Sequence, residues 1–316
     1  MNNIENYRLF DLLHHLKSMP LKADALAAKE EGVWRKYSTQ EYIDTVNNLS
    51  YAFLNLGVKP GDKIGLITNN RPEWNFVDYA CLQTGSISVP LYPTISESDL
   101  THVIKDAGIT YFFVTDAKMY HKVKACAGNL EIKEIYTIDR CEDLPCIKDL
   151  ILKGKEQPKE VELEKIKASV KNTDLATLIY TSGTTGNPKG VMLSHHNFIS
   201  NIMATYSLCD FKFEWRALSF LPLNHVYERM LSYLYISLGI SVYYAENLEK
   251  IGDNLKEINP HIFVTVPRLL EKVYEKIVSK GSELTGIKKA LFFWALNLGL
   301  RFEQHKANGW WYEFQL

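Results

Sequence analysis

The chain has 316 residues, of which 46% are hydrophobic and 23% are charged, so a disordered or collagen-like protein is excluded. At roughly 150 residues per domain, this length predicts about two domains. The 36 lysines and arginines nearly balance the 37 aspartates and glutamates, and a net charge of −1 gives no reason to expect nucleic acid as a partner.

The cysteines argue against disulfides and against zinc. They are five, an odd number, and scattered, which indicates a reducing compartment such as the cytoplasm. Cys141 and Cys146 form a C-x4-C pair without a second Cys or His pair nearby, which is a poor zinc signature. The first residues include acidic side chains and no long apolar run, so no signal peptide is expected.

In chain order, short apolar runs alternate with helical patterns. Ser38-x-x-Glu41 has the form of a capping box, and the apolar spacing after it predicts a helix that stops near Gly57. Strands are then predicted at Lys63–Thr68, Ile87–Pro90, Tyr111–Thr115 and Ile132–Ile138, with helices at Pro72–Gln83 and Ser96–Ala107.

The second half continues this alternation after a charged stretch. Residues 148–171 are predicted as a solvated connecting segment that could include one exposed helix. Further strands are predicted at Ala176–Thr181, Arg216–Leu221, Ser241–Ala245 and His261–Val266. This alternation predicts an α/β fold of layered, mostly parallel sheets flanked by helices.

Two apolar segments are too short to span a bilayer. Met230–Ala245 contains Gly239, which predicts a helix, a glycine stop and a strand. Ala290–Leu300 is predicted as a core helix, with contact to a bilayer or to a partner surface as the alternative. Peripheral membrane contact therefore stays open.

Residues 176–197, ATLIYTSGTTGNPKGVMLSHHN, have a composition suited to phosphate. Glycines let backbone N–H groups approach an anion closely. Four hydroxyls and one ammonium can bind phosphate oxygens or Mg²⁺: those of Thr181, Ser182, Thr184, Thr185 and Lys189. Pro188 and Gly190 flank the lysine, so the pattern is not a Walker A loop. On composition alone, a flexible polar surface loop is an equal alternative.

The loop YTSGTTGNPKGV resembles the signature loop of the adenylate-forming superfamily, which includes acyl-CoA synthetases, luciferases and the adenylation domains of peptide synthetases. The resemblance implies that an acid reacts with ATP to give an acyl-adenylate and pyrophosphate, and that coenzyme A then takes the acyl group. It also implies that Lys189 is catalytic and that Thr181 is a ligand of Mg²⁺. The implied phosphate contacts are Thr181, Ser182, Gly183, Thr184, Thr185, Gly186 and Lys189.

Residues 221–229, LPLNHVYER, resemble a segment of long-chain fatty acyl-CoA synthetases that lies beside the acyl pocket. The resemblance places His225 near the substrate carboxylate and the α-phosphate, as a catalytic residue that stabilises developing charge. Without the resemblance, a helix-capping or core histidine would be the better interpretation of His225. Tyr227, Glu228 and Arg229 stay unassigned, because a packed ring and a surface ion pair would match equally well.

Weaker similarities extend the resemblance from about Tyr37 to the end of the chain. Thr265–Ile277 is similar to a helix start in the same group, with Pro267 at the first helical position. We expect residues 1–57 to pack on a second subdomain, residues 58–200 to form a first α/β subdomain that carries the loop, and residues 201–316 to form the second, incomplete one.

Superfamily members are longer, and several of their later motifs are missing here. An aromatic-Gly-x-Thr-Glu segment, a ribose-binding acidic residue, a hinge and a small C-terminal domain have no match. We therefore expect the N-terminal part of an ATP-dependent long-chain fatty acid–CoA ligase, inactive as this piece alone. An adenylating enzyme for an amino or aryl acid, and a nucleotide-binding protein without catalysis, remain as alternatives.

Overall fold

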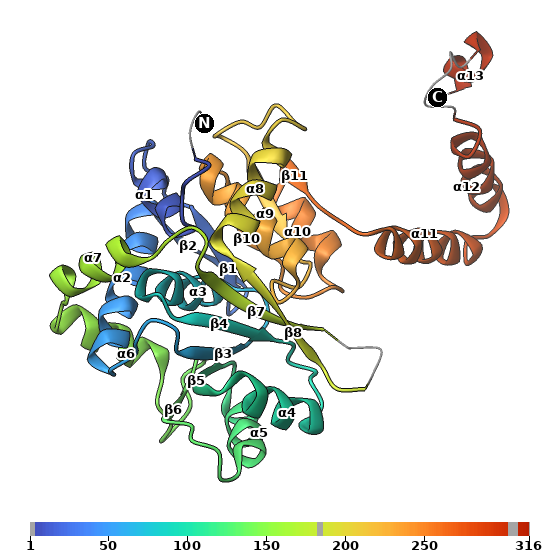
Figure 1. Cartoon of the computed structure of the whole chain (residues 1–316). Coiled ribbons are helices and arrows are strands. Elements are labelled where there is room, and N and C mark those ends of the chain that lie inside the picture. Colours follow the sequence, from blue (N-terminus) through green and yellow to red (C-terminus); the bar gives the residue numbers. More distant parts are fainter. Residues whose placement is uncertain (1–3, 182–185, 303–308, 316) are drawn as a thin grey trace. The chain divides into compact units, whose positions relative to one another are not determined.

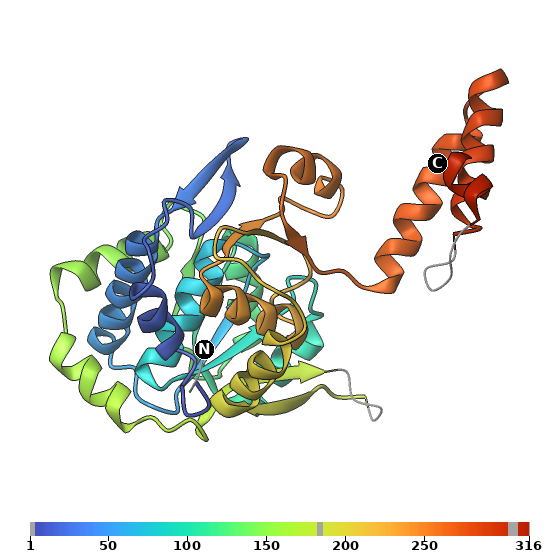
Figure 2. The same cartoon turned by 90° about the horizontal axis from the view of Figure 1, so that it is seen from above.

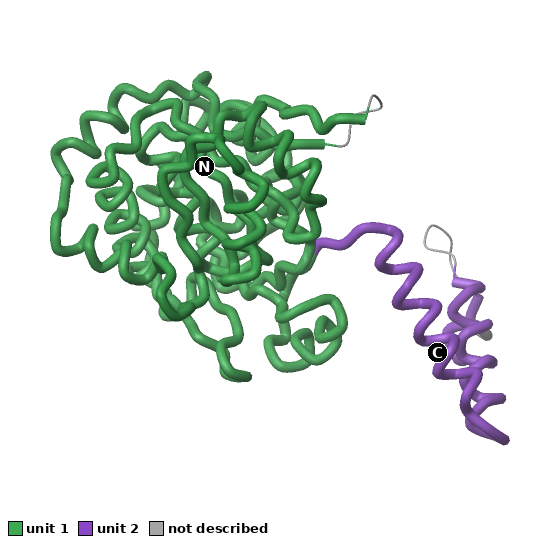
Figure 3. The backbone as a smooth tube through the Cα atoms, turned by 90° about the horizontal axis from the view of Figure 1, so that it is seen from below, with its two compact units in different colours: residues 1–263 green, residues 264–316 purple. Residues whose placement is uncertain are grey.

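The computed structural model describes residues 4–181, 186–302 and 309–315. The chain divides into two units, Met1–Phe263 and Val264–Leu316 (Figure 3). The three-part division expected from the sequence, at residues 57 and 200, stays a prediction.

The first unit contains two sheets. The six-stranded sheet has the order β6 (Glu134–Thr137), β5 (Ile109–Val114), β3 (Lys63–Ile67), β4 (Ile87–Leu91), β7 (Leu175–Thr181) and β8 (Lys189–Ser194). The five-stranded sheet has the order β11 (Ile262–Phe263), β9 (Arg216–Ser219), β10 (Ser241–Tyr244), β1 (Leu26–Glu30) and β2 (Val33–Tyr37). Only β8 and β2 pair antiparallel among these strands, so the predicted α/β fold of mostly parallel sheets is confirmed.

Helix α3 (Pro72–Thr84) lies between the two sheets (Figure 1). Its thirteen residues are all buried, and it contacts β3 and β4 of one sheet and β1 of the other. Pro72 begins the helix, where its missing N–H costs nothing, and Gly85 ends it with φ = 67° in the left-handed region. A helix that is buried on every side shows no amphipathic stripe, and its two charged residues, Glu73 and Asp78, pair with Arg71 and Arg229.

The outer face of the six-stranded sheet is covered by α4 (Glu97–Ala107) and α5 (Ala117–Ala127) (Figure 1). Leu100, Val103 and Ile104 of α4 join Phe112 of β5 in one buried cluster. Ser96 and Asp116 cap these helices by accepting backbone N–H groups three residues on. The helix predicted at Ser96–Ala107 is confirmed.

The charged stretch after β6 was predicted wrongly. It forms two helices, α6 (Ile147–Glu156) and α7 (Glu160–Ser169), which pack against α2 (Thr39–Asn55). Leu150 of α6 and Leu163 of α7 are buried there. The many lysines and glutamates around them make the narrow apolar stripe hard to recognise in the sequence. The predicted cap of α2 is half formed, because Ser38 accepts the N–H of Glu41 while the Glu41 carboxylate pairs with Arg35.

Three further helices complete the first unit beside α1 (Asp11–Lys17): α8 (His195–Tyr206), α9 (Val226–Leu238) and α10 (Ile251–Ile258). Gly239 ends α9 with φ = 66° and β10 follows, as the glycine stop predicts. In the part of the chain that the structure describes, no helix has the length and apolarity needed to cross a bilayer.

The second unit consists of α11 (Pro267–Ser282), α12 (Gly286–Gly299) and α13 (Trp310–Gln315), drawn in orange to red in Figure 2. Pro267 begins α11, as predicted. The helix predicted at Ala290–Leu300 is confirmed within α12, but its core position is wrong: Leu298 is buried, whereas Leu291 and Trp294 are 58% and 49% exposed. Helix α12 meets α11 along one side only, where the ring of Phe292 lies against Gly281.

Candidate active site

Strands β7 and β8 form a hairpin whose ends carry two of the predicted phosphate contacts. Thr181 ends β7, Lys189 begins β8, and the two are paired in the register. Both are exposed, and directly opposed residues of an antiparallel pair lie on the same face. The structure therefore brings this hydroxyl and this ammonium together, and Gly186 between them has φ = 101°. The predicted contacts Ser182, Gly183, Thr184 and Thr185 lie outside the described residues.

His225 occupies the N-cap of α9. Its Nδ1 accepts the backbone N–H of Tyr227 at 3.5 Å, and its carbonyl oxygen accepts the N–H of Arg229. Because Nδ1 is an acceptor, neutral His225 carries its proton on Nε2, which leaves an exposed N–H donor. The capping geometry and an anion-binding role are thus compatible in one side chain.

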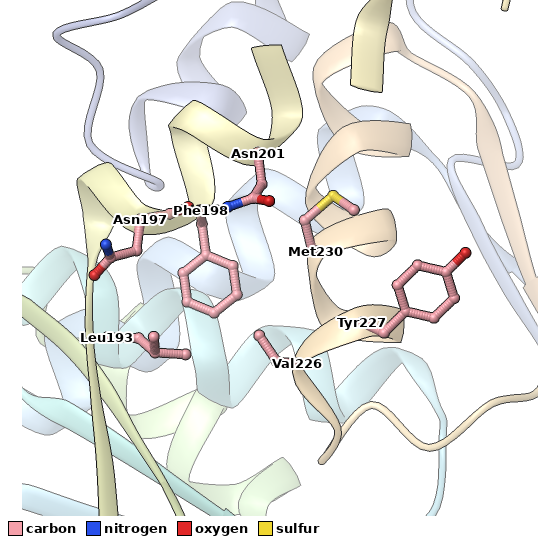
Figure 4. A pocket seen from close by; sticks show the side chains of 7 residues that line it. All are labelled: Leu193, Asn197, Phe198, Asn201, Val226, Tyr227 and Met230. Carbon is pink, nitrogen blue, oxygen red and sulfur yellow. Dashed lines mark hydrogen bonds between the residues drawn. The ribbon is translucent and has the colours of Figure 1, made fainter. Parts of the chain in front are cut away.

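A pocket of about 180 Å³ lies between β8, α8 and α9 (Figure 4). Figure 4 shows Leu193, Phe198 and Val226 pointing toward one another. The pocket is lined by Leu193 of β8, by Asn197, Phe198 and Asn201 of α8, and by Val226, Tyr227 and Met230 of α9. Two of these residues directly follow His225 in the sequence, so the histidine lies at the edge of an apolar pocket.

The hairpin and the pocket share one strand. Lys189 and Leu193 are four residues apart on β8, so they lie on the same face and are separated by about 13 Å. The pair Thr177 and Leu193 lies on that face too, as does the pair Thr181 and Lys189. One face of β7–β8 therefore runs from a phosphate-suited end to an apolar pocket.

A sequence profile described as AMP-binding enzyme matches residues 14–298. The chain belongs to the AMP-binding enzyme family. This match covers most of the chain, from α1 to α12, and confirms the resemblance carried by the 180–191 loop.

Curated relatives of this chain include long-chain acyl-CoA synthetases. The long-chain-fatty-acid–CoA ligase ACSBG2 of Xenopus laevis is 30% identical over 299 residues, which cover 90% of this chain and 40% of that protein. The peroxisomal long chain acyl-CoA synthetase 6 of Arabidopsis thaliana is 31% identical over 256 residues, which cover 76% of this chain and 35% of that protein. The chain thus spans about two fifths of the length of these relatives.

Solved structures share the fold of this AMP-binding enzyme. A long-chain-fatty-acid-CoA ligase (FadD1) from Archaeoglobus fulgidus matches with a TM-score of 0.74 at 19% identity, covering 87% of this chain and 54% of that one. The adenylation domain of a carboxylate reductase from Mycobacterium chelonae matches with a TM-score of 0.77 at 18% identity, covering 92% and 51%. At these identities, the likeness concerns the fold alone.

A buried ionic network lies behind the candidate site. Arg229, fully buried, donates to Thr177 Oγ1 at 2.6 Å, to Ser88 Oγ at 2.7 Å and to Tyr233 Oη at 2.9 Å, and it pairs with Asp78. The guanidinium therefore joins α9 to α3 and to strands β4 and β7. A surface ion pair, left open by the sequence, is excluded for this residue.

The network also supports the pocket wall, because the Arg229 guanidinium lies 5.5 Å from the centre of the Phe198 ring. Beside it, Glu228 is buried and accepts a hydrogen bond from Ser219 Oγ at 2.6 Å. Burial raises the pKa of Glu228 to about 7, while the hydrogen bond from Ser219 opposes the shift.

The pocket and the network were missed by reasoning from the sequence. Pocket residues come from three elements and include two asparagines, so no local pattern marks them. Arg229 and Asp78 are 151 residues apart, and an arginine on a helix usually indicates a surface position. One signal was available: Ser194 and Asn197 form a capping box directly after the loop, which marks the start of α8.

Proposed function

We propose that this chain supplies the phosphate-binding and acyl-binding parts of an ATP-dependent long-chain fatty acid–CoA ligase. The observation that carries the proposal is the shared face of β8, with Lys189 at one end and Leu193 in the pocket wall. The relatives named as long-chain acyl-CoA synthetases support the acid class.

In the proposed reaction, an oxygen of the fatty acid carboxylate bonds to the α-phosphorus of ATP, and the bond to pyrophosphate breaks. Coenzyme A then displaces AMP to give the thioester. A carboxylate is already ionised at pH 7, so the attack needs no general base, and the barrier lies in bringing two anions together. This is the reason for placing cationic and donor groups at the site rather than a proton acceptor.

The residues present fit Mg-ATP. Lys189 contributes a positive charge on the face that Thr181 shares, and the Thr181 hydroxyl offers one oxygen ligand. Mg²⁺ keeps several waters and is often held by one or two protein oxygens together with phosphates, so a single hydroxyl suits it. When bound, the ion would neutralise charge on the departing pyrophosphate.

His225 is proposed to meet the acid at the pocket edge. It is exposed and directly precedes Val226 and Tyr227, which line the pocket. There it would donate to the carboxylate or to an α-phosphate oxygen as charge develops. The helix N-terminus behind it adds a favourable field for an anion.

Calorimetric titration of the purified chain with Mg-ATP and with hexadecanoic acid tests the proposal. Lys189→Ala should weaken Mg-ATP binding about tenfold or more, because a hydrogen bond to a charged group is lost. Val226→Trp should fill the pocket and weaken binding of the acid while leaving Mg-ATP binding unchanged. Matched controls are Lys118→Ala on α5 and Val161→Trp on α7, both exposed outside the site.

The outcomes separate the alternatives. Binding of Mg-ATP without binding of any acid would favour a nucleotide-binding protein without catalysis. Preference for an amino acid or an aryl acid over hexadecanoic acid would change the substrate class. We expect the 316-residue chain alone to form no acyl-CoA, and thioester formation by it would contradict that part of the proposal.

A further inference from the structure

Helix α4 holds the β7–β8 hairpin at two points, one on each strand. His102 Nε2 lies 3.0 Å from the carbonyl oxygen of Pro188, and Tyr180 Oη donates to Asp106 Oδ2 at 2.6 Å. A carbonyl oxygen only accepts, so His102 donates through an Nε2–H. His102 and Asp106 are four residues apart and therefore lie on one face of α4.

Each contact lies next to a proposed phosphate ligand. Pro188 directly precedes Lys189, and Tyr180 directly precedes Thr181. Because side chains alternate across a strand, Tyr180 faces α4 while Thr181 faces the opposite side. The helix thus holds the back of the hairpin and leaves its ligand face free.

The hairpin needs such support. Strands β4 and β7 lie side by side with Ser88 and Thr177 in register, but β4 ends at Leu91, so Thr181 at the end of β7 extends past β4 and is paired with Lys189 of β8. Strand β8 is the edge of the sheet. A two-stranded ribbon on its own is marginally stable in water, so contacts from outside the sheet decide how firmly its end is held.

Gly190, the register partner of Tyr180, leaves room for the Tyr180 ring that contacts α4. A Cβ at this position would lie 3.0 Å from the Tyr180 ring, so the absent side chain lets the ring lie against the β8 backbone. Burial, together with the hydrogen bond to Asp106, raises the pKa of Tyr180, which keeps its hydroxyl protonated as a donor.

We propose that His102, Asp106 and Tyr180 are positioning residues that hold the strand ends carrying Thr181 and Lys189 in place for phosphate binding. This inference rests on the proposed function, because the phosphate role of those two residues is part of it. The three side chains touch no ligand themselves and act through the backbone of the hairpin.

The test uses the purified 316-residue chain with two readouts. One is amide hydrogen exchange at residues 189–191, and the other is the affinity for Mg-ATP. His102→Ala should raise the exchange rate and weaken Mg-ATP binding about fivefold, whereas His102→Gln, which keeps an N–H donor, should restore both. Tyr180→Phe removes the other contact and should act in the same direction. Lys105→Ala, exposed on the same helix, is the matched control and should change neither readout.

The two proposals fail in different ways. If the unaltered chain binds no Mg-ATP, the proposed function is overturned. Faster exchange in His102→Ala but not in His102→Gln would then still show that α4 holds the hairpin in place. If the unaltered chain binds Mg-ATP and His102→Ala binds it equally well, the positioning role is overturned. A lowered unfolding temperature shared by the alanine and glutamine variants, without rescue, would overturn it too.

Discussion

Glu228 and Arg229 are neighbours on α9 with opposite electrostatic surroundings. Arg229 is fully buried against the carboxylate of Asp78, and removing one partner of such a pair typically costs about 3–5 kcal/mol. Glu228 is 3% exposed and accepts the hydroxyl of Ser219. Its ionised form is therefore the costly one, and the folded state retains a proton on it up to about pH 7.

Glu228→Gln should stabilise the protein at pH 8 and change little at pH 4.5. Burial raises the pKa of Glu228 from 4.5 to about 7, so between these values the folded state binds a proton that the unfolded state has released. Stability falls as pH rises through this window, and glutamine, which mimics the protonated acid, avoids a loss of about 3 kcal/mol. Urea unfolding of both proteins at pH 4.5, 6 and 8 measures the difference.

His195 is a second buried titratable group, but it does not affect this comparison. Burial lowers its pKa to about 4, so the folded state holds the imidazole neutral and stability falls as pH drops from 6.5 toward 4. His195 is present in both proteins, so its contribution cancels in the difference between them. An equal difference at pH 4.5 and pH 8 would show that Glu228 is not protonated by folding.

At the scale of elements, the sequence predicted what local periodicity can reveal. The helix after Ser38 and the strand at Lys63–Ile67 were predictable, because each buries one face or both. Strand β8 was not, since its Val191 and Met192 are exposed and face no core. Helix α6 was hidden by its charges, and only its contact with α2 explains the small residue Gly154.

Gly154→Ala should destabilise the protein by about 3 kcal/mol. A Cβ at this position would lie 1.8 Å from the backbone oxygen of Asn48 in α2, so the two helices would have to separate. Gly252→Ala on α10 is the matched control, because nothing lies within 4 Å of its Cβ. Since alanine is the better helix former, that change should leave stability equal or raise it by up to about 1 kcal/mol.

Thermal and urea unfolding of the two glycine variants measure this contrast. Similar small effects at both positions would contradict a close backbone contact between α2 and α6. The candidate site shows the same limit of sequence reasoning: Lys189 and His225 were predicted from local motifs, whereas the pocket needed three elements to be placed in space.

At the scale of the whole molecule, the first unit is held together by polar contacts that cross from one sheet to the other. Asn70, after β3, donates to the carbonyl oxygen of Leu221 at 2.6 Å and accepts the N–H of Leu223 at 2.9 Å, after β9. Asn75 of α3 donates to Tyr244 Oη of β10 at 2.6 Å. The Asn70 contacts are partly buried and the Asn75 contact is buried, and together they join the end of β3 and helix α3 to the five-stranded sheet and the segment after β9.

The second unit buries few apolar side chains of its own. Among its described residues, Leu298 is the single buried apolar side chain, whereas the first unit buries apolar side chains throughout its two sheets and the helices around them. The cooperative unfolding of the chain should therefore reflect the first unit.

A chain ended after Phe263 should unfold within about 2 °C of the full 316-residue chain, because a change of 1 kcal/mol moves Tm by about 2–4 °C at this size. A chain ended after Leu238 is the control, since it loses β10, which pairs with both β1 and β9 in the middle of the five-stranded sheet. That control should show no cooperative transition. Circular dichroism during heating distinguishes the cases, and a large drop in Tm for the longer chain would show that residues after 263 support the core.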